Sequence, residues 1–151
     1  MKPIFIYESK IPKFLSIFIS VYGITLYPFI IFRDKQEKIP KRTINHELIH
    51  IRQQKELFIV VFYFLYVYYW IKNLIFLKSS SKAYYKIPFE IEAYENDENE
   101  KYLDERLSHS WTKYRKLSKP CISCKHGTCC CSKEEFCDAC ECDPCDCEDL
   151  M

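Results

Sequence analysis

Residues 44–57 read INHELIHIRQQKEL and contain the pattern H-E-x-x-H. The segment has no glycine or proline and its apolar residues recur at helical spacing, so it predicts a helix. Residues four apart lie on one face of a helix, so His46 and His50 can direct ring nitrogens at a single ion. Glu47 lies about 100° further round the helix, close to that ion without having to bind it.

Two histidines with this glutamate between them suit metal-dependent hydrolysis. Catalytic zinc commonly has three protein ligands and one open position. The ion lowers the pKa of a water molecule, and Glu47 can take its proton and pass it to a leaving amine. We therefore interpret His46 and His50 as zinc ligands and Glu47 as the general base. The alternative is an exposed helix that carries two histidines without a metal.

The third ligand has to come from elsewhere in the chain, and His109 is one candidate. A richer one is the segment 88–96, which reads PFEIEAYEN and predicts a second helix. Glu90 and Glu92 lie two residues apart, on different faces, so only one of them can point at the ion. We favour Glu90 and keep Glu92 open. The residue four positions after each of them could orient the ligand.

The other segments predict an α+β fold that is mainly helical. Apolar residues alternate over 15–21, as in a strand, and Gly23 could turn the chain into Ile24–Phe32, where Pro28 indicates an edge or a bulge. Such a hairpin competes with a transmembrane helix over residues 14–32, which carry no charge. The polar or proline-containing segments predict loops, namely residues 2–13 and 33–41.

Helices are expected in the rest of the domain. Thr43 or Asn45 could cap the first of them. Residues 44–77 predict one long helix, or two with a bend, and the serines at 79–81 should end it. A charged helix is expected from Pro88 to about Leu107.

Residues 57–77 form a second apolar run, broken by Lys72 and Asn73. If this run crossed a bilayer once, the two histidines and the candidate glutamates would lie on opposite sides and could not share an ion. Its four tyrosines and one tryptophan favour the membrane interface over the bilayer centre. We therefore expect the run to lie along a membrane surface or to be buried in the protein, and both alternatives stay open. A protein that spans the membrane twice is the third alternative, and it would exclude Glu90 and Glu92 as ligands.

The charge distribution adds a partner and a compartment to this interpretation. Residues 1–119 carry 20 Lys and Arg against 13 Asp and Glu. Such a surplus suits the anionic, cytoplasmic face of a membrane. Nucleic acid is not expected as a partner, because the basic residues are scattered and no recognition motif accompanies them.

All ten cysteines lie in residues 120–151, where 8 acidic residues face 2 basic ones. The chain thus divides into a domain, residues 1–119, and a Cys-rich acidic tail. Adjacent and alternate thiols favour thiolates that bridge Zn²⁺ or Cu⁺, and the tail should be disordered without metal. A disulfide-rich tail and acylated cysteines are the alternatives. The predicted tail ligands are Cys121, Cys124, Cys129, Cys130, Cys131, Cys137, Cys140, Cys142, Cys145 and Cys147.

The H-E-x-x-H helix with a downstream glutamate helix resembles the gluzincin metallopeptidases. Some members show Glu-x-x-Ala-Asp or Glu-x-Glu-Ala-Asn with the first glutamate as ligand. That pattern implies Glu90, with Tyr94 where Asp or Asn would stand. Others show Glu-Ala-x-x-Asp, which implies Glu92, with Asn96 in the Asp position.

Two further resemblances cover other parts of the chain. Residues 20–116 resemble a small family of bacterial and bacteriophage proteins taken as peptidases from the same motif, through ITLYPFIIF, INHELIHIRQQKEL, FYFLY, AYY and PFEIEAYEN. The tail resembles a metallothionein in its C-x-C and C-x-x-C steps. The first resemblance implies a peptidase fold, and the second implies a metal-binding tail.

Together these features predict a membrane-associated zinc metallopeptidase that acts on a peptide or protein substrate. The alternative function is a non-catalytic, membrane-associated protein that binds or buffers metal. In the peptidase, Tyr63, Tyr84 or Tyr94 could stabilise the oxyanion. The strand Ile24–Phe32 could pair with an extended substrate by β-addition.

Overall fold

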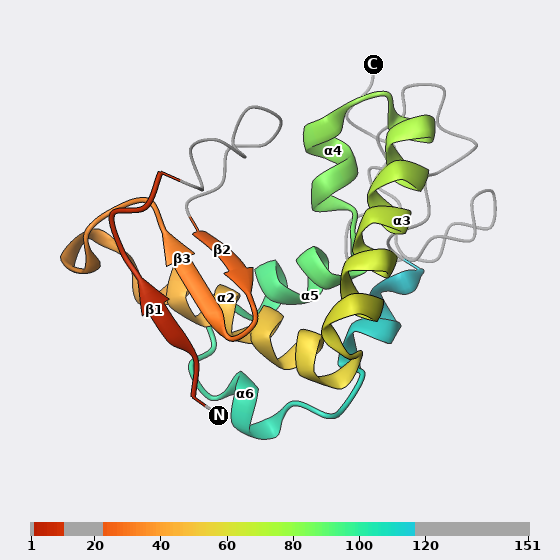
Figure 1. The fold of residues 1–151 in the computed structure, drawn as a ribbon. Helices are drawn as coiled ribbons and strands as arrows, with labels where there is room; N and C mark the ends of the chain where they lie inside the picture. Colours follow the sequence, from red (N-terminus) through yellow and green to blue (C-terminus); the bar gives the residue numbers. More distant parts are fainter. Residues whose placement is uncertain (1, 11–22, 117–151) are drawn as a thin grey trace, which may run out of the picture.

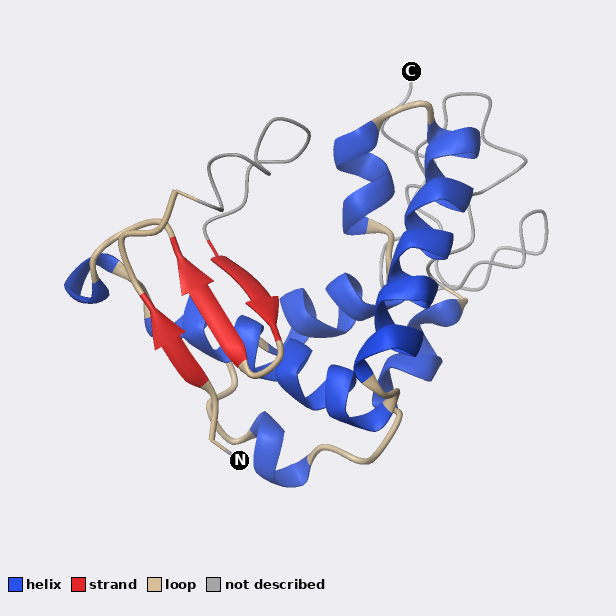
Figure 2. Cartoon of the chain, viewed as in Figure 1, coloured by secondary structure: helices blue, strands red, loops and turns tan. Residues whose placement is uncertain are grey.

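The computed structural model describes residues 2–10 and 23–116, and its fold is α+β and mainly helical, as predicted (Figures 1 and 2). A small sheet lies at one side of the molecule, and two packed helices stand at the other (Figure 2). The strand expected over 15–21 and the Cys-rich tail lie outside the described residues.

The sheet has three short strands in the order β1 (Ile4–Ile6), β3 (Phe29–Phe32), β2 (Gly23–Leu26). β2 and β3 form an antiparallel hairpin, with Ile24 opposite Ile31, whereas β1 pairs parallel to β3. Residues 23–32 therefore form a hairpin of their own within the predicted second strand, whereas the predicted first strand, residues 15–21, lies outside the described residues.

Three details of the strand prediction are wrong. The chain turns at Tyr27–Pro28, whereas Gly23 lies inside β2 and Pro28 causes no bulge. β3 is the central strand of the described sheet, whose edges are β1 and β2, so within Ile24–Phe32 only the β2 part lies at an edge. β1 lies in the segment 2–13 that was predicted as a loop. The prediction missed this strand because three apolar residues are too few to show a strand period.

The long apolar segment forms two helices, α2 (Lys41–Glu56) and α3 (Ile59–Leu77). They separate at Phe58, whose φ of 55° lies in the left-handed region. α2 begins three residues earlier than predicted, with Pro40 as its N-cap. Pro40 has an extended ψ of 146°, so the first helical residue is Lys41. Asn45 is no cap, since its side-chain amide donates to the Asn96, Asp97 and Asn99 carbonyls.

The second half of the domain consists of short helices: α4 (Ser80–Tyr85), α5 (Pro88–Asn96) and α6 (Tyr102–Glu105). The short 3₁₀ turn η2 (Ser110–Arg115) follows them, and a second one, η1 (Gln36–Lys38), lies between β3 and α2. The serines do end α3, and Ser79 caps α4 by accepting from the Lys82 amide. The single helix predicted from Pro88 to Leu107 is wrong, because Asn96 and Asn99 form a turn there.

This arrangement brings five elements together around one pocket, namely β2, α2, α3, α4 and α5. α2 packs on β2 at one side and on α5 at the other. α3 leaves the end of α2, and α4 packs back along it, so the chain returns to α5 (Figure 1). The largest apolar cluster joins α3, α4, α5 and η2, and contains Phe62, Tyr69, Tyr84, Ile87, Phe89 and Trp111.

Candidate metal centre

Three potential ligands meet where α2 packs on α5. His46 and His50 lie one turn apart on α2, and their Nε2 atoms are 3.2 Å apart. The carboxylate of Glu90, from the first turn of α5, lies 3.3 Å from the His46 Nε2 and 3.2 Å from the His50 Nε2. All three side chains are buried. In the described part of the chain, this is the one cluster whose ligand atoms could hold a metal ion.

These spacings suit a tetrahedral ion. With metal–ligand bonds of about 2.0–2.1 Å, two ligand atoms at a tetrahedral angle are about 3.3 Å apart. The two histidine Nε2 atoms, 3.2 Å apart, fall within 0.1 Å of that value, and a different Glu90 oxygen lies at about that distance from each ring, Oε2 from His46 and Oε1 from His50. Within residues 2–10 and 23–116, the buried Oε2 of Glu90 also has no hydrogen-bond partner. A buried acceptor without a donor is costly, and a bound cation would satisfy it.

The same groups perturb each other's protonation. Burial by itself lowers the pKa of His50, but the adjacent Glu90 carboxylate outweighs burial and raises this pKa to about 9. Burial likewise raises the pKa of Glu90, but the two imidazoles outweigh it and hold this pKa well below its usual range. Without a metal, His50 and Glu90 therefore form an ion pair at neutral pH.

Gln53 fixes the orientation of His50. Its side-chain NH₂ donates to the Phe89 carbonyl at 3.1 Å and to Glu92 Oε2 at 2.8 Å, and both partners can only accept. The Gln53 oxygen must therefore face the His50 Nδ1, 2.8 Å away, and accept its proton. This leaves the lone pair of neutral His50 on Nε2, toward Glu90, where a metal ligand needs it.

Glu92, the other carboxylate candidate, lies outside the cluster. Its oxygens accept from Arg106 Nε at 2.6 Å and from the Tyr102 hydroxyl at 2.8 Å, besides Gln53. Arg106 also pairs with Glu56. Because Glu92 and Arg106 are both buried, we interpret this network as the support that holds Gln53, and through it His50.

His46 has a corresponding support on its other side. Its Nδ1 lies 3.5 Å from Asp97 Oδ2, directly after α5. Asp97 is buried and pairs with Arg42 Nε at 2.8 Å. The Asp97 carboxylate therefore favours a proton on the Nδ1 of His46, which again leaves Nε2 free for a ligand bond. His109, the remaining candidate ligand, is exposed in the loop before η2 and lies outside the cluster.

Glu47 is buried between α2 and β2 beside the cluster. The Thr25 hydroxyl donates to its Oε2 at 2.5 Å. Gly23 allows this close packing, because a Cβ at that position would lie 2.9 Å from Glu47 Oε1 and equally close to the Phe32 ring. Glycine at position 23 thus serves the approach of β2 to Glu47 and not, as predicted, a turn.

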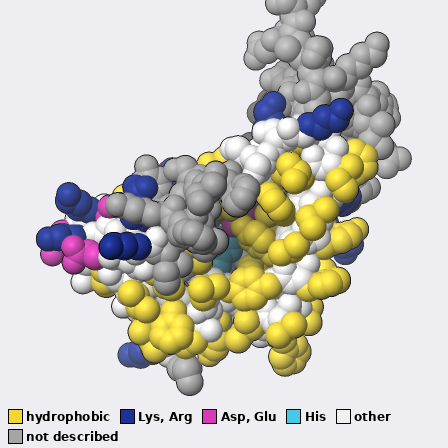
Figure 3. Space-filling view, turned by 45° about the horizontal axis from the view of Figure 1, so that its top comes forward, with side chains coloured by type: hydrophobic (Ala, Val, Ile, Leu, Met, Phe, Trp, Pro, Cys, Tyr) yellow, Lys and Arg dark blue, Asp and Glu magenta, His cyan; other side chains and the backbone are white. Residues whose placement is uncertain are grey.

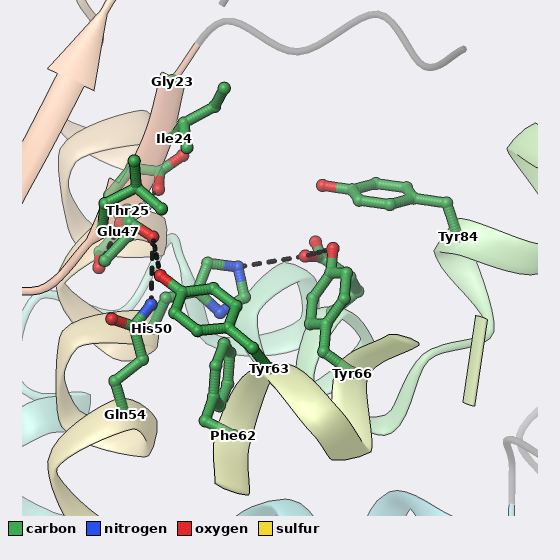
Figure 4. Close-up of a pocket in the computed structure, with 12 residues that line it drawn as sticks. Gly23, Ile24, Thr25, Glu47, His50, Gln54, Phe62, Tyr63, Tyr66 and Tyr84 are labelled. Carbon is green, nitrogen blue, oxygen red and sulfur yellow. Dashed lines mark hydrogen bonds and ion pairs between the residues drawn. The ribbon is translucent and has the colours of Figure 1, made fainter. Parts of the chain in front are cut away.

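The cluster opens into a pocket of about 310 Å³ (Figure 4). Glu47, His50 and Glu90 form its polar floor, β2 forms one wall, and α3 with Tyr84 of α4 forms the opposite wall. Most of the other lining side chains are apolar or aromatic, among them Ile24, Leu26, Phe62, Tyr63 and Tyr66.

The tyrosines predicted as oxyanion donors differ in position. Tyr63 donates to the Thr25 carbonyl at 2.9 Å, so its proton is engaged. The Tyr84 side chain extends from α4 into the pocket, with its hydroxyl directed across it toward β2 (Figure 4). Burial and then the Glu90 charge raise the Tyr84 pKa well above its usual value, which keeps the hydroxyl protonated. Tyr94 contacts the His46 ring from the side, at 4.5 Å between ring centroids.

Tyr66 is a residue of the site that the sequence did not single out. Its hydroxyl donates to Glu90 Oε1 at 2.7 Å, and burial raises its pKa well above the usual value. Tyr66 is one of the four tyrosines of the apolar run 57–77, which we interpreted as residues of the membrane interface. The available signal was its spacing of three residues from Tyr63, which puts both hydroxyls on the same side of α3.

The edge of β2 is partly occupied, which limits β-addition. The Gln54 side chain donates to the Thr25 carbonyl at 3.0 Å and accepts from the Tyr27 amide at 2.9 Å. A peptide could therefore pair only near the Gly23 end of β2. Comparison of the chain with protein-family models, curated proteins and solved structures finds no match.

Proposed function

We propose that this chain is a zinc-dependent peptidase whose ion is held by His46, His50 and Glu90. The observation that carries the proposal is the convergence of three buried side chains, whose ligand atoms lie within 4.8 Å of one another, beside a buried glutamate and an open pocket. Two imidazoles and one carboxylate suit zinc, whereas calcium and magnesium prefer shells of oxygen ligands. A bound zinc ion would polarise the scissile carbonyl and lower the pKa of a water molecule.

Glu47 would carry the protons in this mechanism. It lies next to His46 in the chain and lines the pocket floor with His50 and Glu90. The Thr25 hydroxyl holds one carboxylate oxygen, so the other is oriented to accept a proton from water. Glu47 then gives this proton to the amine released from the cleaved peptide bond.

Tyr84 is the best-placed donor for the developing oxyanion. Its hydroxyl projects into the pocket opposite the floor and stays protonated at neutral pH (Figure 4). Tyr63 is engaged with β2, and Tyr66 already donates to Glu90. We therefore assign oxyanion stabilisation to Tyr84 and the orientation of Glu90 to Tyr66.

The pocket walls indicate the substrate side chain. Ile24, Leu26, Phe62 and Tyr63 give the cavity an apolar lining next to the reacting groups. A cavity of about 310 Å³ can hold one large aliphatic or aromatic side chain. We expect cleavage next to such residues in an extended peptide.

A proteome-derived peptide library tests this function, with cleavage sites read by mass spectrometry. The zinc-loaded full-length chain should cut next to large apolar residues, and Glu47→Gln should abolish cutting while keeping zinc. Tyr84→Phe should retain zinc and cut more slowly. Cleavage that survives Glu47→Gln would disprove the mechanism, and no cleavage by zinc-loaded protein would leave only metal binding.

A further inference from the structure

The outer face of α3 carries a continuous apolar stripe that faces away from the protein. Val60, Phe64, Val67, Ile71 and Ile75 recur at intervals of three or four residues, so they share one side of the helix. All five are exposed, with 80% of Val60 and 73% of Phe64 accessible. Figure 3 shows hydrophobic side chains along this part of the molecule. We call these five residues the α3 stripe.

The opposite side of α3 is apolar as well, because it packs into the domain. Phe62 and Tyr69 are buried there. A helix that is apolar on all sides is ordinarily enclosed by protein or lipid. By length and composition α3 is also the one helix among the described residues that could cross a membrane. The α3 stripe is therefore an apolar surface that we expect protein or lipid to cover.

The segment that carries the stripe and the segment that packs beside it at the groove are basic and contain no acidic residue. Residues 57–89 contain four lysines and no aspartate or glutamate, and residues 110–116 add three more basic residues and no acid. Lys72, Arg115 and Lys116 line a groove of about 370 Å³ together with Tyr68, Tyr69 and Thr112. Within the described ranges these three cations have no ion-pair partner.

We propose that this surface docks the protein on an anionic lipid bilayer. The α3 stripe enters the interface between headgroups and acyl chains, and the basic groove binds lipid phosphates. Apolar side chains beside Lys and Arg are the combination that interfacial helices use. The tyrosines and lysines of the groove are residue types that favour the headgroup region of a bilayer. There an aromatic ring is half-buried while a charged group stays hydrated.

The inner side of α3 argues for docking and against a crossing. Tyr63 donates to the Thr25 carbonyl and Tyr66 to Glu90. The buried Asn73 amide donates to the Ala83 carbonyl on α4. A crossing would break these bonds and bury their polar groups in hydrocarbon. With these bonds intact, only the stripe side of α3 is open to lipid.

A second copy of the chain is a poorer covering than lipid. A twofold contact through the stripe would place the same patch of each copy against its partner. Both copies would bring segments 57–89 and 110–116, which hold seven basic residues and no acidic one, so such a contact offers no charge complementarity. Anionic lipid supplies the opposite charge.

Flotation of the full-length chain with vesicles tests the proposal. The protein should float with vesicles of equal parts phosphatidylglycerol and phosphatidylcholine. Much less protein should float with pure phosphatidylcholine vesicles, or with the anionic vesicles at high salt. Ile71→Glu should weaken binding by about 30-fold or more. Its matched control is Ile4→Glu on β1, since Ile71 is 46% and Ile4 47% exposed. This control should float like wild type.

Further variants separate the remaining outcomes. Lys72→Glu with Arg115→Glu should weaken binding to the anionic vesicles, whereas Lys38→Glu on η1 should not. Circular dichroism checks that every variant is folded. Equal flotation of Ile71→Glu and Ile4→Glu would overturn the proposal. So would a stable soluble dimer that ignores vesicles, or bound protein that resists alkaline carbonate as a spanning helix does. None of these readouts depends on zinc or hydrolysis.

Discussion

The His50–Glu90 pair predicts how the stability of the metal-free protein depends on pH. In the fold, burial lowers the pKa of His50, but the charge and hydrogen bond of Glu90, with smaller contributions from Glu47 and Gln53, together raise it from 6.5 to about 9. A raised pKa stabilises the fold at low pH, below the unfolded value. That stabilisation is lost as the pH rises toward 9.

The size of the effect follows from the shift. A difference of about 2.5 pH units corresponds to about 3 kcal/mol of unfolding free energy between pH 6 and pH 9.5. The lowered pKa of Glu90 arises from the same ion pair, so it adds no further unfolding free energy to this value. The assay is urea unfolding in EDTA, followed by circular dichroism. The tail cysteines are replaced by serine, so that thiol titration does not contribute.

Two controls make this prediction specific. Glu90→Gln removes the carboxylate that raises the pKa of His50, so stability should depend much less on pH between 6 and 9.5. Zinc must displace the same proton, so its affinity should rise about tenfold per pH unit from pH 7 to 9. A metal-free protein that is equally stable at pH 6 and 9.5, or more stable at 9.5, would refute the reasoning.

Three substitutions extend the account to the surroundings of the site. Gly23→Ala places a Cβ 2.9 Å from Glu47 Oε1; it should cost about 1–3 kcal/mol in urea unfolding and abolish hydrolysis while zinc stays bound. Tyr66→Phe removes the donor to Glu90 and should lower zinc affinity about 10- to 100-fold in a competition titration. Arg106→Met leaves Glu92 buried without its partner and should cost about 3–5 kcal/mol, which Glu92→Gln in the same chain should largely restore.

The sequence predicts the centre of the site because helical spacing dictates it. His46 and His50 share a face in any regular helix, and residues two apart must point differently, so Glu90 and Glu92 had to separate. The sequence also shows that residues 57–77 cannot cross a bilayer once if ligands before and after this run bind the same ion. The fold agrees with that constraint, since α4 returns the chain alongside α3.

The supports of the site depend on tertiary contacts that no local pattern encodes. Gln53 matters because α5 places Phe89 and Glu92 opposite it, and Arg106 because the loop after α6 brings it to Glu92. Turn chemistry explains the shortened helix after Pro88. Asn96 and Asn99 end α5 and the following turn, although the charge pattern alone would have allowed a helix to continue.

The zinc content of the full-length chain with its ten cysteines replaced by serine tests the central claim most directly. Glu90→Gln and Glu47→Gln form a matched pair, because both remove a buried carboxylate that lines the same pocket. The account predicts one zinc per chain in the parent and in Glu47→Gln, and none in folded Glu90→Gln. No zinc in the parent, or zinc retained in Glu90→Gln, would contradict it.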